Sequence, residues 1–218
     1  FLFNIVDITD KKQLNIINRS FDVIVHLAGM AGVRNSINDP NLYVKNNIMG
    51  TINLLDLCRE NEIKRFVYSS SSSVYGLNTK IPFKEDDPIE KCNSPYAVTK
   101  LSKEAFCSLY HQLYGIHTIG LRFFTVYGPR GRPDMAPFKF MDSIILGRPI
   151  DKYGNGDSMR DYTYISDTVD GVVSAVDKSS YIKNEIYNLG NTNPISLNEF
   201  IETCETVVGK GARINQVG

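Results

Sequence analysis

Residues 65–76 read RFVYSSSSSVYG, and they give the clearest local indication of the fold class. It begins as an apolar run typical of a β-strand, continues through five serines and ends at Gly76. In open α/β sheets, ligands bind beyond the carboxyl ends of the strands. We therefore expect residues 64–69 to form a strand whose serines lie at a ligand site. A serine-rich turn that binds nothing is the alternative at this point.

Strand-like and helix-like segments alternate along the chain. Further short apolar runs occupy residues 2–6, 23–28, 118–124 and 185–189. Asp39-Pro40 and Ser94-Pro95 each place an N-cap residue before a proline, so we expect a helix to begin at each pair. The second helix ends at Gly115. One of its faces carries an apolar stripe formed by Ala97, Leu101, Ala105, Leu109 and Leu113. This alternation predicts an α/β fold of the Rossmann type, with a doubly wound parallel sheet.

The residue composition of the sequence changes after Tyr127. Turn-forming residues become frequent, at positions 128–129, 132–133, 148–149 and 154–156. We expect one domain over residues 1–127 and a smaller, partly irregular domain over residues 128–218. We also expect two segments of the second domain, at about residues 163–176 and 185–189, to return to the main sheet.

The composition argues against several functional classes. The chain has 218 residues, of which 42% are hydrophobic and 22% are charged, as in an ordinary globular protein. Its 24 basic and 24 acidic residues cancel, so no overall field favours nucleic acid or an anionic membrane. No apolar run is long enough to cross a membrane. The widely spaced cysteines argue against a metal site or a disulfide framework and fit a cytoplasmic, reducing compartment. They are Cys58, Cys92, Cys107 and Cys204.

Tyr96 and Lys100 supply the first chemical signal. They lie four residues apart on the helix predicted to begin at Ser94-Pro95, so their side chains share one helix face. A tyrosine with an ordinary pKa is a poor base at neutral pH, but an adjacent ammonium group favours its phenolate. The pair alone is a weak signal, because a surface tyrosine and lysine often have this spacing. It becomes specific when a hydroxyl cluster at the end of a strand, residues 69–73, precedes the pair.

This Ser–Tyr–Lys arrangement resembles that of the extended short-chain dehydrogenase/reductases, in particular the NAD-dependent epimerase/dehydratase family of nucleotide-sugar enzymes. The similar stretches span nearly the whole chain in family order. They are HLAG at 26–29, DP at 39–40, SSSSSVYG at 69–76, SPYAVTK at 94–100, LRFFTVYGP at 121–129 and RDYTYI at 160–165. Within the family, UDP-glucuronate 4-epimerases are most similar to AGVR at 31–34, SSSVYG at 71–76 and GRPDMA at 131–136.

The resemblance implies a redox cycle with no net redox change. Tyr96 would take the proton of the sugar 4-hydroxyl with the help of Ser71, while NAD accepts the hydride from carbon 4. The transient 4-keto sugar would turn over before the hydride returns to its other face. Lys100 would hold the nicotinamide ribose and lower the pKa of Tyr96. The implied reaction converts UDP-glucuronate to UDP-galacturonate, a precursor for polysaccharide biosynthesis.

The resemblance also assigns residues to the substrate. Family dehydratases carry an acid pair where this chain has Ser72 and Ser73, so dehydration is disfavoured. These serines and Thr125 would instead donate hydrogen bonds to a sugar carboxylate, since galactose-type 4-epimerases usually have asparagine at the position of Thr125. Plain hydrogen bonding at the strand edge is the alternative for all three. Arg160, and after it Arg132, would bind the diphosphate through their guanidinium groups.

For the cofactor, the resemblance points to three groups of residues. Asp7 and Ile8 would lie near the adenine, Leu27, Ala28 and Gly29 under the pyrophosphate, and Asn46 or Asn47, Ser69, Tyr96, Lys100 and Phe124 near the ribose and nicotinamide. The family begins with a strand, a G-x-x-G-x-x-G turn and a helix, and this sequence has no such motif. We therefore expect the chain to be a fragment that lacks the first strand–helix–strand unit.

Family members usually dimerise through two long helices, which implies a homodimer built on residues 41–61 and 95–115. Both segments carry apolar residues beyond one stripe, namely Tyr43, Leu54, Leu57, Phe106 and Tyr110. Three other functions stay open at the level of the sequence. They are a UDP-glucose 4-epimerase, a UDP-glucuronate decarboxylase and an inactive fragment that retains the fold.

Overall fold

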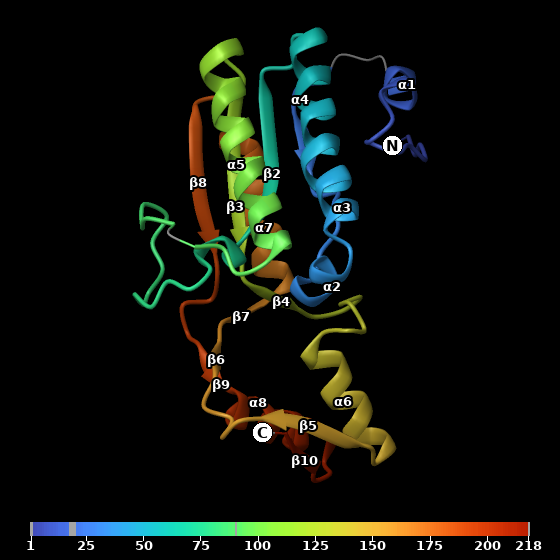
Figure 1. Cartoon of the computed structure of the whole chain (residues 1–218), viewed down its shortest axis with the longest axis vertical. Helices are drawn as coiled ribbons and strands as arrows, with labels where there is room; N and C mark the ends of the chain where they lie inside the picture. The colour runs from blue at the N-terminus through green and yellow to red at the C-terminus, as the bar shows by residue number, and fades with distance from the viewer. Residues whose placement is uncertain (1, 18–20, 90, 218) are drawn as a thin grey trace. The chain divides into compact units, whose positions relative to one another are not determined.

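The computed structural model describes residues 2–17, 21–89 and 91–217 and divides the chain into two compact units (Figure 1). Unit 1 comprises Phe1–Phe123 and Asp170–Leu189, and unit 2 comprises Phe124–Val169 and Gly190–Gly218. The first change of unit therefore falls just after residue 123, a few residues before the sequence-based boundary at 127. The chain returns to unit 1 over residues 170–189.

Unit 1 is built on a four-stranded parallel sheet in the order β1-β2-β3-β8. The strands are β1 (Ile24–His26), β2 (Arg65–Ser71), β3 (His117–Phe123) and β8 (Asn184–Leu189). The parallel order confirms the predicted Rossmann-type α/β fold. The prediction of a strand at residues 2–6 is wrong. This segment pairs with no strand among the described residues, and its Leu2, Phe3 and Ile5 side chains are exposed.

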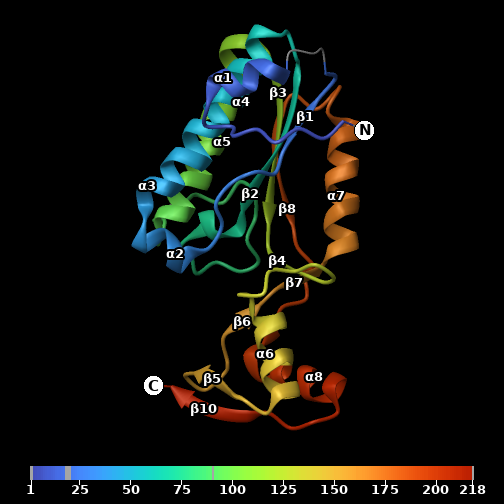
Figure 2. The ribbon, with the colours of Figure 1, turned by 90° about the vertical axis from the view of Figure 1, so that its right-hand side faces the viewer.

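Helices cover both faces of this sheet (Figure 2). On one face lie α4 (Gly50–Glu60) and α5 (Pro95–Tyr114), and on the other lie residues 170–178 of α7 (Ile165–Lys178). Alternate residues of β2 enter the two cores, since Phe66 packs with the α4 and α5 side and Val67 packs with the α7 side. Burial on both faces explains why the strand sequences are nearly continuous apolar runs.

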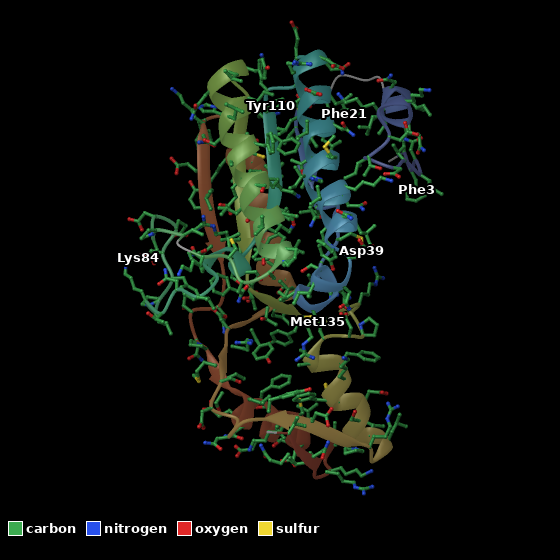
Figure 3. The ribbon with its side chains drawn as sticks, in the orientation of Figure 1. Phe3, Phe21, Asp39, Lys84, Tyr110 and Met135 are labelled. Carbon is green, nitrogen blue, oxygen red and sulfur yellow. The ribbon has the colours of Figure 1, made fainter. Side chains whose placement is uncertain are left out.

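The two long helical segments begin where the sequence predicts. The Asp39 carboxylate accepts the N–H of Leu42 at the start of α3 (Pro40–Tyr43; Figure 3), and Ser94 Oγ accepts the N–H of Ala97 at the start of α5. Gly115 ends α5 in the left-handed conformation. Between α3 and α4, η2 (Val44–Met49) is a π-helix, so residues 40–60 form one interrupted helical run.

Apart from the buried Ala97, the predicted apolar stripe of α5 does not form the buried face of the helix. Leu109 is 43% exposed and Leu113 is 60% exposed. The buried face instead carries Lys100, Lys103 and Glu104, together with Ala97 and Cys107. This face is polar because it packs against the serines at the end of β2 and the charged residue in β3, which are the groups described below.

Shorter elements complete unit 1: α1 (Lys11–Leu14), η1 (Asn15–Ile17), α2 (Val33–Asn38) and η3 (Ser72–Tyr75). The described part of unit 2 contains three two-stranded sheets: β4 (Thr125–Tyr127) with β7 (Tyr162–Tyr164), β5 (Pro149–Tyr153) with β10 (Arg213–Val217), and β6 (Met159–Arg160) with β9 (Ile195–Ser196). Its helices α6 (Ala136–Leu146) and α8 (Leu197–Val208) enclose a core around Ile144, Ile150 and Phe200. Among the described residues, no helix has both the length and the apolar character needed to cross a bilayer.

Candidate active site

The carboxyl end of β2 carries the predicted hydroxyl cluster. Ser69, Ser70 and Ser71 are all buried there. Lys100 Nζ lies 3.0 Å from Ser69 O and 3.1 Å from Ser69 Oγ, so this ammonium group donates to the strand end. The sequence-predicted lysine and serines are thus brought together by the packing of α5 against β2.

Tyr96 lies in the first turn of α5, where several neighbours fix its position. Its backbone N–H donates to Ser36 Oγ at 3.1 Å, and its ring meets the ring of Tyr43 edge to face at 6.2 Å. Lys100 Nζ lies 5.7 Å from the centroid of the Tyr96 ring. The tyrosine is half-buried, so part of its side chain is accessible to a ligand. The contacts of Ser36 and Tyr43 with Tyr96 were not predicted from the sequence.

Ser71 forms the junction between β2 and the η3 turn. Its Oγ accepts the N–H of Ser73 at 3.2 Å, which makes Ser71 the N-cap of η3. Ser72 and Ser73 are half-buried in this turn. Gly76 ends it with a φ of +57°, and a Cβ there would lie 1.9 Å from Lys91 O. The turn that carries three of the predicted site residues is therefore held at both ends.

The charge on Lys100 is set by two opposing effects. Burial lowers its pKa to about 8, while the nearby Glu104 carboxylate acts to raise it. The ammonium group is therefore present at neutral pH and is lost as the pH rises through about 8. A cation beside Tyr96 favours the phenolate, so the arrangement can support a tyrosine that acts as a base.

The turn after β1 fits a phosphate-bearing cofactor. Leu27, Ala28 and Gly29 follow the strand and are exposed. A Cβ on Gly29 would lie 2.7 Å from Asn47 Oδ1, so only glycine leaves this backbone open. The Asn47 side chain is buried in the π-helix, where Oδ1 accepts the N–H of Met30 and Nδ2 donates to Met30 O.

The other predicted cofactor residues near the amino end have local roles in the structure. Asn46 Nδ2 donates to Leu42 O within the helical run. The Asp7 carboxylate accepts the N–H of Thr9 at 2.8 Å in a turn, which lowers its pKa, and Ile8 O accepts from Asn53 on α4. These contacts are those of a turn anchored to α4, and an adenine contact by Asp7 and Ile8 stays a prediction.

Unit 2 holds the remaining predicted residues. The N–H of Thr125 on β4 donates to Asp161 O, and Phe124 borders Gly190. Arg132 makes a two-pronged ion pair with Asp134 beside a hollow of about 410 Å³, which Met135 also lines. Arg160 lies exposed on β6. The Asp161 carboxylate accepts the N–H groups of Asn191 and Thr192, which fixes the loop before β9.

A buried ion pair that was not predicted from the sequence lies behind the site. Arg122 Nε and Nη2 donate to the two carboxylate oxygens of Glu104 at 3.0 and 2.9 Å, and both side chains are almost fully buried. Two signals in the sequence were available. Arg122 is a lone charge in an otherwise apolar strand, and Glu104 lies one helical turn after Lys100.

Comparisons with known proteins agree with this geometry. The profile described as NAD dependent epimerase/dehydratase family matches residues 2–190. A UDP-glucuronate 4-epimerase from Thermodesulfobacterium geofontis is 42% identical over 216 residues, which cover 98% of this chain and 66% of the relative. The crystal structure of UDP-glucuronic acid 4-epimerase from Bacillus cereus with UDP-glucuronic acid and NAD is 38% identical, with a TM-score of 0.86, and is matched over 97% of this chain and 65% of that one.

A second solved structure is also similar. UDP-glucose 4-epimerase from Thermus thermophilus in complex with NAD is 28% identical, with a TM-score of 0.87, over 96% of this chain and 70% of that one. The chain therefore spans about two thirds of the length of these proteins.

A doubly wound sheet with Ser, Tyr and Lys at its carboxyl edge defines the class of short-chain dehydrogenase/reductases. Within this class, the chain belongs to the NAD-dependent epimerase/dehydratase family, as the sequence resemblance implied. NAD is the cofactor of this family, and the open turn after β1 together with Lys100 fits it.

Proposed function

We propose that the chain carries the catalytic centre of a nucleotide-sugar 4-epimerase that converts UDP-glucuronate to UDP-galacturonate. The observation that supports this most directly is the cluster at the end of β2, where Lys100 contacts Ser69 and lies beside Tyr96 while Ser71 caps the η3 turn. The T. geofontis relative and the B. cereus structure bear the names of UDP-glucuronate 4-epimerases, which favours this substrate.

In this proposal the residues of the chain handle the proton. Tyr96 removes it from the sugar 4-hydroxyl, Ser71 shares the hydrogen bond to that oxygen, and Lys100 stabilises the phenolate. Bound NAD supplies a reversible hydride acceptor for carbon 4. The backbone at Leu27–Ala28–Gly29 would hold the cofactor together with Asn46 or Asn47, Ser69, Lys100 and Phe124, and Asp7 and Ile8 would lie at the adenine end. The 4-keto sugar is the intermediate from which both epimers form.

The sugar carboxylate distinguishes the proposed substrate from its competitors. Ser72 and Ser73 are neutral donors, which suit a carboxylate acceptor, and we assign the same role to Thr125. Arg160 and Arg132 are assigned to the diphosphate. Arg132 must then exchange Asp134 for a phosphate, because the two are paired in the structure. A UDP-glucose 4-epimerase is the second candidate, favoured by the T. thermophilus structure.

The remaining alternatives concern the reaction and the assembly. A decarboxylase would release carbon dioxide from the same uronate, and an inactive fragment would keep the fold without turnover. We further propose a homodimer that acts in the cytoplasm on a route to polysaccharides. The exposed end of the α5 stripe supports the dimer, since Leu109 and Leu113 leave a large part of their apolar surface uncovered.

The experiment that tests the function is conversion of UDP-glucuronate by the purified chain with NAD⁺, followed by proton NMR. We expect the signals of UDP-galacturonate to appear, and Tyr96→Phe to reduce the rate by about a hundredfold or more. Turnover of UDP-glucose but not of the uronate would reject the carboxylate role of Ser72 and Ser73. A pentose product would identify the decarboxylase. A folded chain that converts neither sugar would support the inactive fragment.

A further inference from the structure

Glu104 lies where the helix α5 contacts the end of strand β2 at the candidate site. It follows Lys100 by one helical turn on the buried face of α5, as Lys100 follows Tyr96. Two consecutive serines of β2 meet this face. Ser69 accepts from Lys100, and Ser70 Oγ donates to Glu104 Oε1 in a short hydrogen bond. The helix that carries Tyr96 is therefore tied to the end of β2 at two successive positions.

The far side of Glu104 is held by Arg122, which also reaches the η3 turn. Arg122 Nη1 donates to Tyr75 OH at 2.9 Å, and Tyr75 OH donates to Asn188 Oδ1 at 2.8 Å. The backbone N–H of Asn188 donates to Glu85 Oε1, and Asn188 Nδ2 donates to Phe83 O. Both partners lie in the loop that contains Lys84 (Figure 3). One buried carboxylate thus connects α5, β2 and β3, and through Arg122 it connects to the turn after Ser71.

The charges around Lys100 make Glu104 exceptional. The titratable groups that face Lys100 are His26 from β1 and Tyr96, Lys103 and Glu104 from α5, with Arg122 from β3 behind Glu104. Among these described groups, only Glu104 has a carboxyl side chain. Lys100 and Arg122 are both buried, and burial of two cations is unfavourable unless a carboxylate balances their charge.

We propose that Glu104 is a positioning residue that acts through Lys100, because its buried carboxylate keeps the Lys100 ammonium charged and registered against Ser69 beside Tyr96. The inference rests on the proposed function only for the catalytic meaning of Lys100. The alternative is a purely structural role, in which Glu104 serves only to neutralise Arg122.

The test is a pH titration of Lys100 that does not depend on turnover. The chain is labelled with ¹³Cε-lysine, and the Lys100 signal is assigned by its loss in Lys100→Arg. In Glu104→Gln, which keeps the shape and removes the charge, we expect the midpoint of this signal to move to lower pH by about one unit. Glu104→Asp restores the charge and should return the midpoint toward that of the wild type.

A double variant separates the two roles. Glu104→Gln with Arg122→Met removes both members of the ion pair, so a role limited to neutralising Arg122 predicts a wild-type midpoint for Lys100. Our proposal predicts that the midpoint stays low, and it is overturned if the midpoint returns in the double variant or never moves in Glu104→Gln. If Glu104→Gln does not fold, the double variant and Glu104→Asp still decide.

Activity gives an independent readout. If the chain is an active epimerase, the alkaline limb of its rate profile should move by the same amount as the NMR midpoint, with little change in KM. A chain without epimerase activity would contradict the proposed function but leave the NMR titration, and therefore the role of Glu104, fully testable.

Discussion

His26 is a buried histidine whose surroundings oppose its protonation. Its Nε2 lies 2.9 Å from Thr51 Oγ1 and 3.1 Å from Lys103 Nζ, and its Nδ1 has no hydrogen-bond partner among the described residues. Burial and the neighbouring lysines lower its pKa to about 2. The unfolded chain binds a proton near pH 6.5, so the folded state loses stability as the pH falls below that value.

This argument predicts the pH dependence of unfolding. Between about pH 6 and pH 4, His26 should contribute a loss of about 1.4 kcal/mol of unfolding free energy per pH unit. Urea titrations of the wild type and His26→Gln at several pH values measure the difference. The two curves should converge as the pH falls, and parallel curves would show that His26 is protonated in the folded chain.

Asn47 and Asn46 form a matched pair on the helical run of residues 40–60. Asn47→Ala removes the partner of both the N–H and the carbonyl of Met30, so we expect a loss of about 2 kcal/mol in unfolding free energy. Asn46→Ala removes only a bond to Leu42 O at the surface and should cost less than about 0.5 kcal/mol. Equal losses in chemical denaturation would contradict the structural role assigned to Asn47.

At the residue scale, spacing predicted that the serines of residues 69–73 and Lys100 lie at one site, but it did not predict the Glu104–Arg122 pair. The first follows from helix periodicity and from the edge at which parallel strands end. The second depends on which of several possible carboxylates lies opposite one arginine of β3. That choice is made by the packing of α5 on the sheet, which sequence spacing does not specify.

At the scale of elements, two glycines with left-handed backbones allow a controlled comparison. Gly76 ends η3 with a φ of +57°, and Gly115 ends α5 with a φ of +67°. A Cβ at Gly115 would meet no atom within 4 Å, whereas a Cβ at Gly76 would lie 1.9 Å from the backbone oxygen of Lys91. The first substitution therefore carries only the conformational cost, and the second adds a backbone clash.

The expected losses follow from this difference. Gly115→Ala should lower the unfolding free energy by about 1 kcal/mol, and Gly76→Ala by more than about 3 kcal/mol. Because η3 carries Ser72 and Ser73, Gly76→Ala should also weaken sugar binding in any active preparation. Chemical denaturation of both variants checks the order, and similar losses would show that the η3 turn can relax away from Lys91.

The type of each long helix could be predicted from the sequence, but which of its faces is buried could not. Caps at Asp39 and Ser94 marked both helix starts, because an N-cap and a following proline act locally. The stripe at Leu109 and Leu113 had helical spacing but lies exposed, since the buried face of α5 is occupied by charged residues with partners in the sheet. The π-helix at η2 was not predicted from the sequence, and the Asn47 side chain within it contacts Met30, 17 residues away in the chain.

At the scale of the whole molecule, strand–helix alternation predicted the sheet of unit 1. The boundary between the two units was harder to predict from the sequence. Turn residues begin at Gly128, but β4 already belongs to unit 2 and pairs with β7, so the change of unit comes before the turns that seemed to mark it. The segment at 2–6 shows the related difficulty that an apolar run becomes a strand only when a partner strand accepts its hydrogen bonds.

The dimer proposed for this chain is a prediction about its long helices. Of the apolar residues that the sequence suggested for the interface, Leu54 and Leu57 are buried in the core of unit 1. The exposed apolar residues of α5 include Leu109 and Leu113, which lie one helical turn apart and form an apolar strip. A second copy of the chain would bury this strip against its own equivalent in a two-fold arrangement.

We expect light scattering after size-exclusion chromatography to give twice the chain mass of 24.5 kDa for the wild type. Leu109→Glu combined with Leu113→Glu should give the monomer mass, because the paired helices would then bury like charges, while far-UV circular dichroism stays unchanged. Val207→Glu is the matched control, since Val207 is 66% exposed on α8 of unit 2 and should leave the mass doubled. A doubled mass that survives the α5 substitutions would assign the interface to another surface, and a monomeric wild type would reject the dimer.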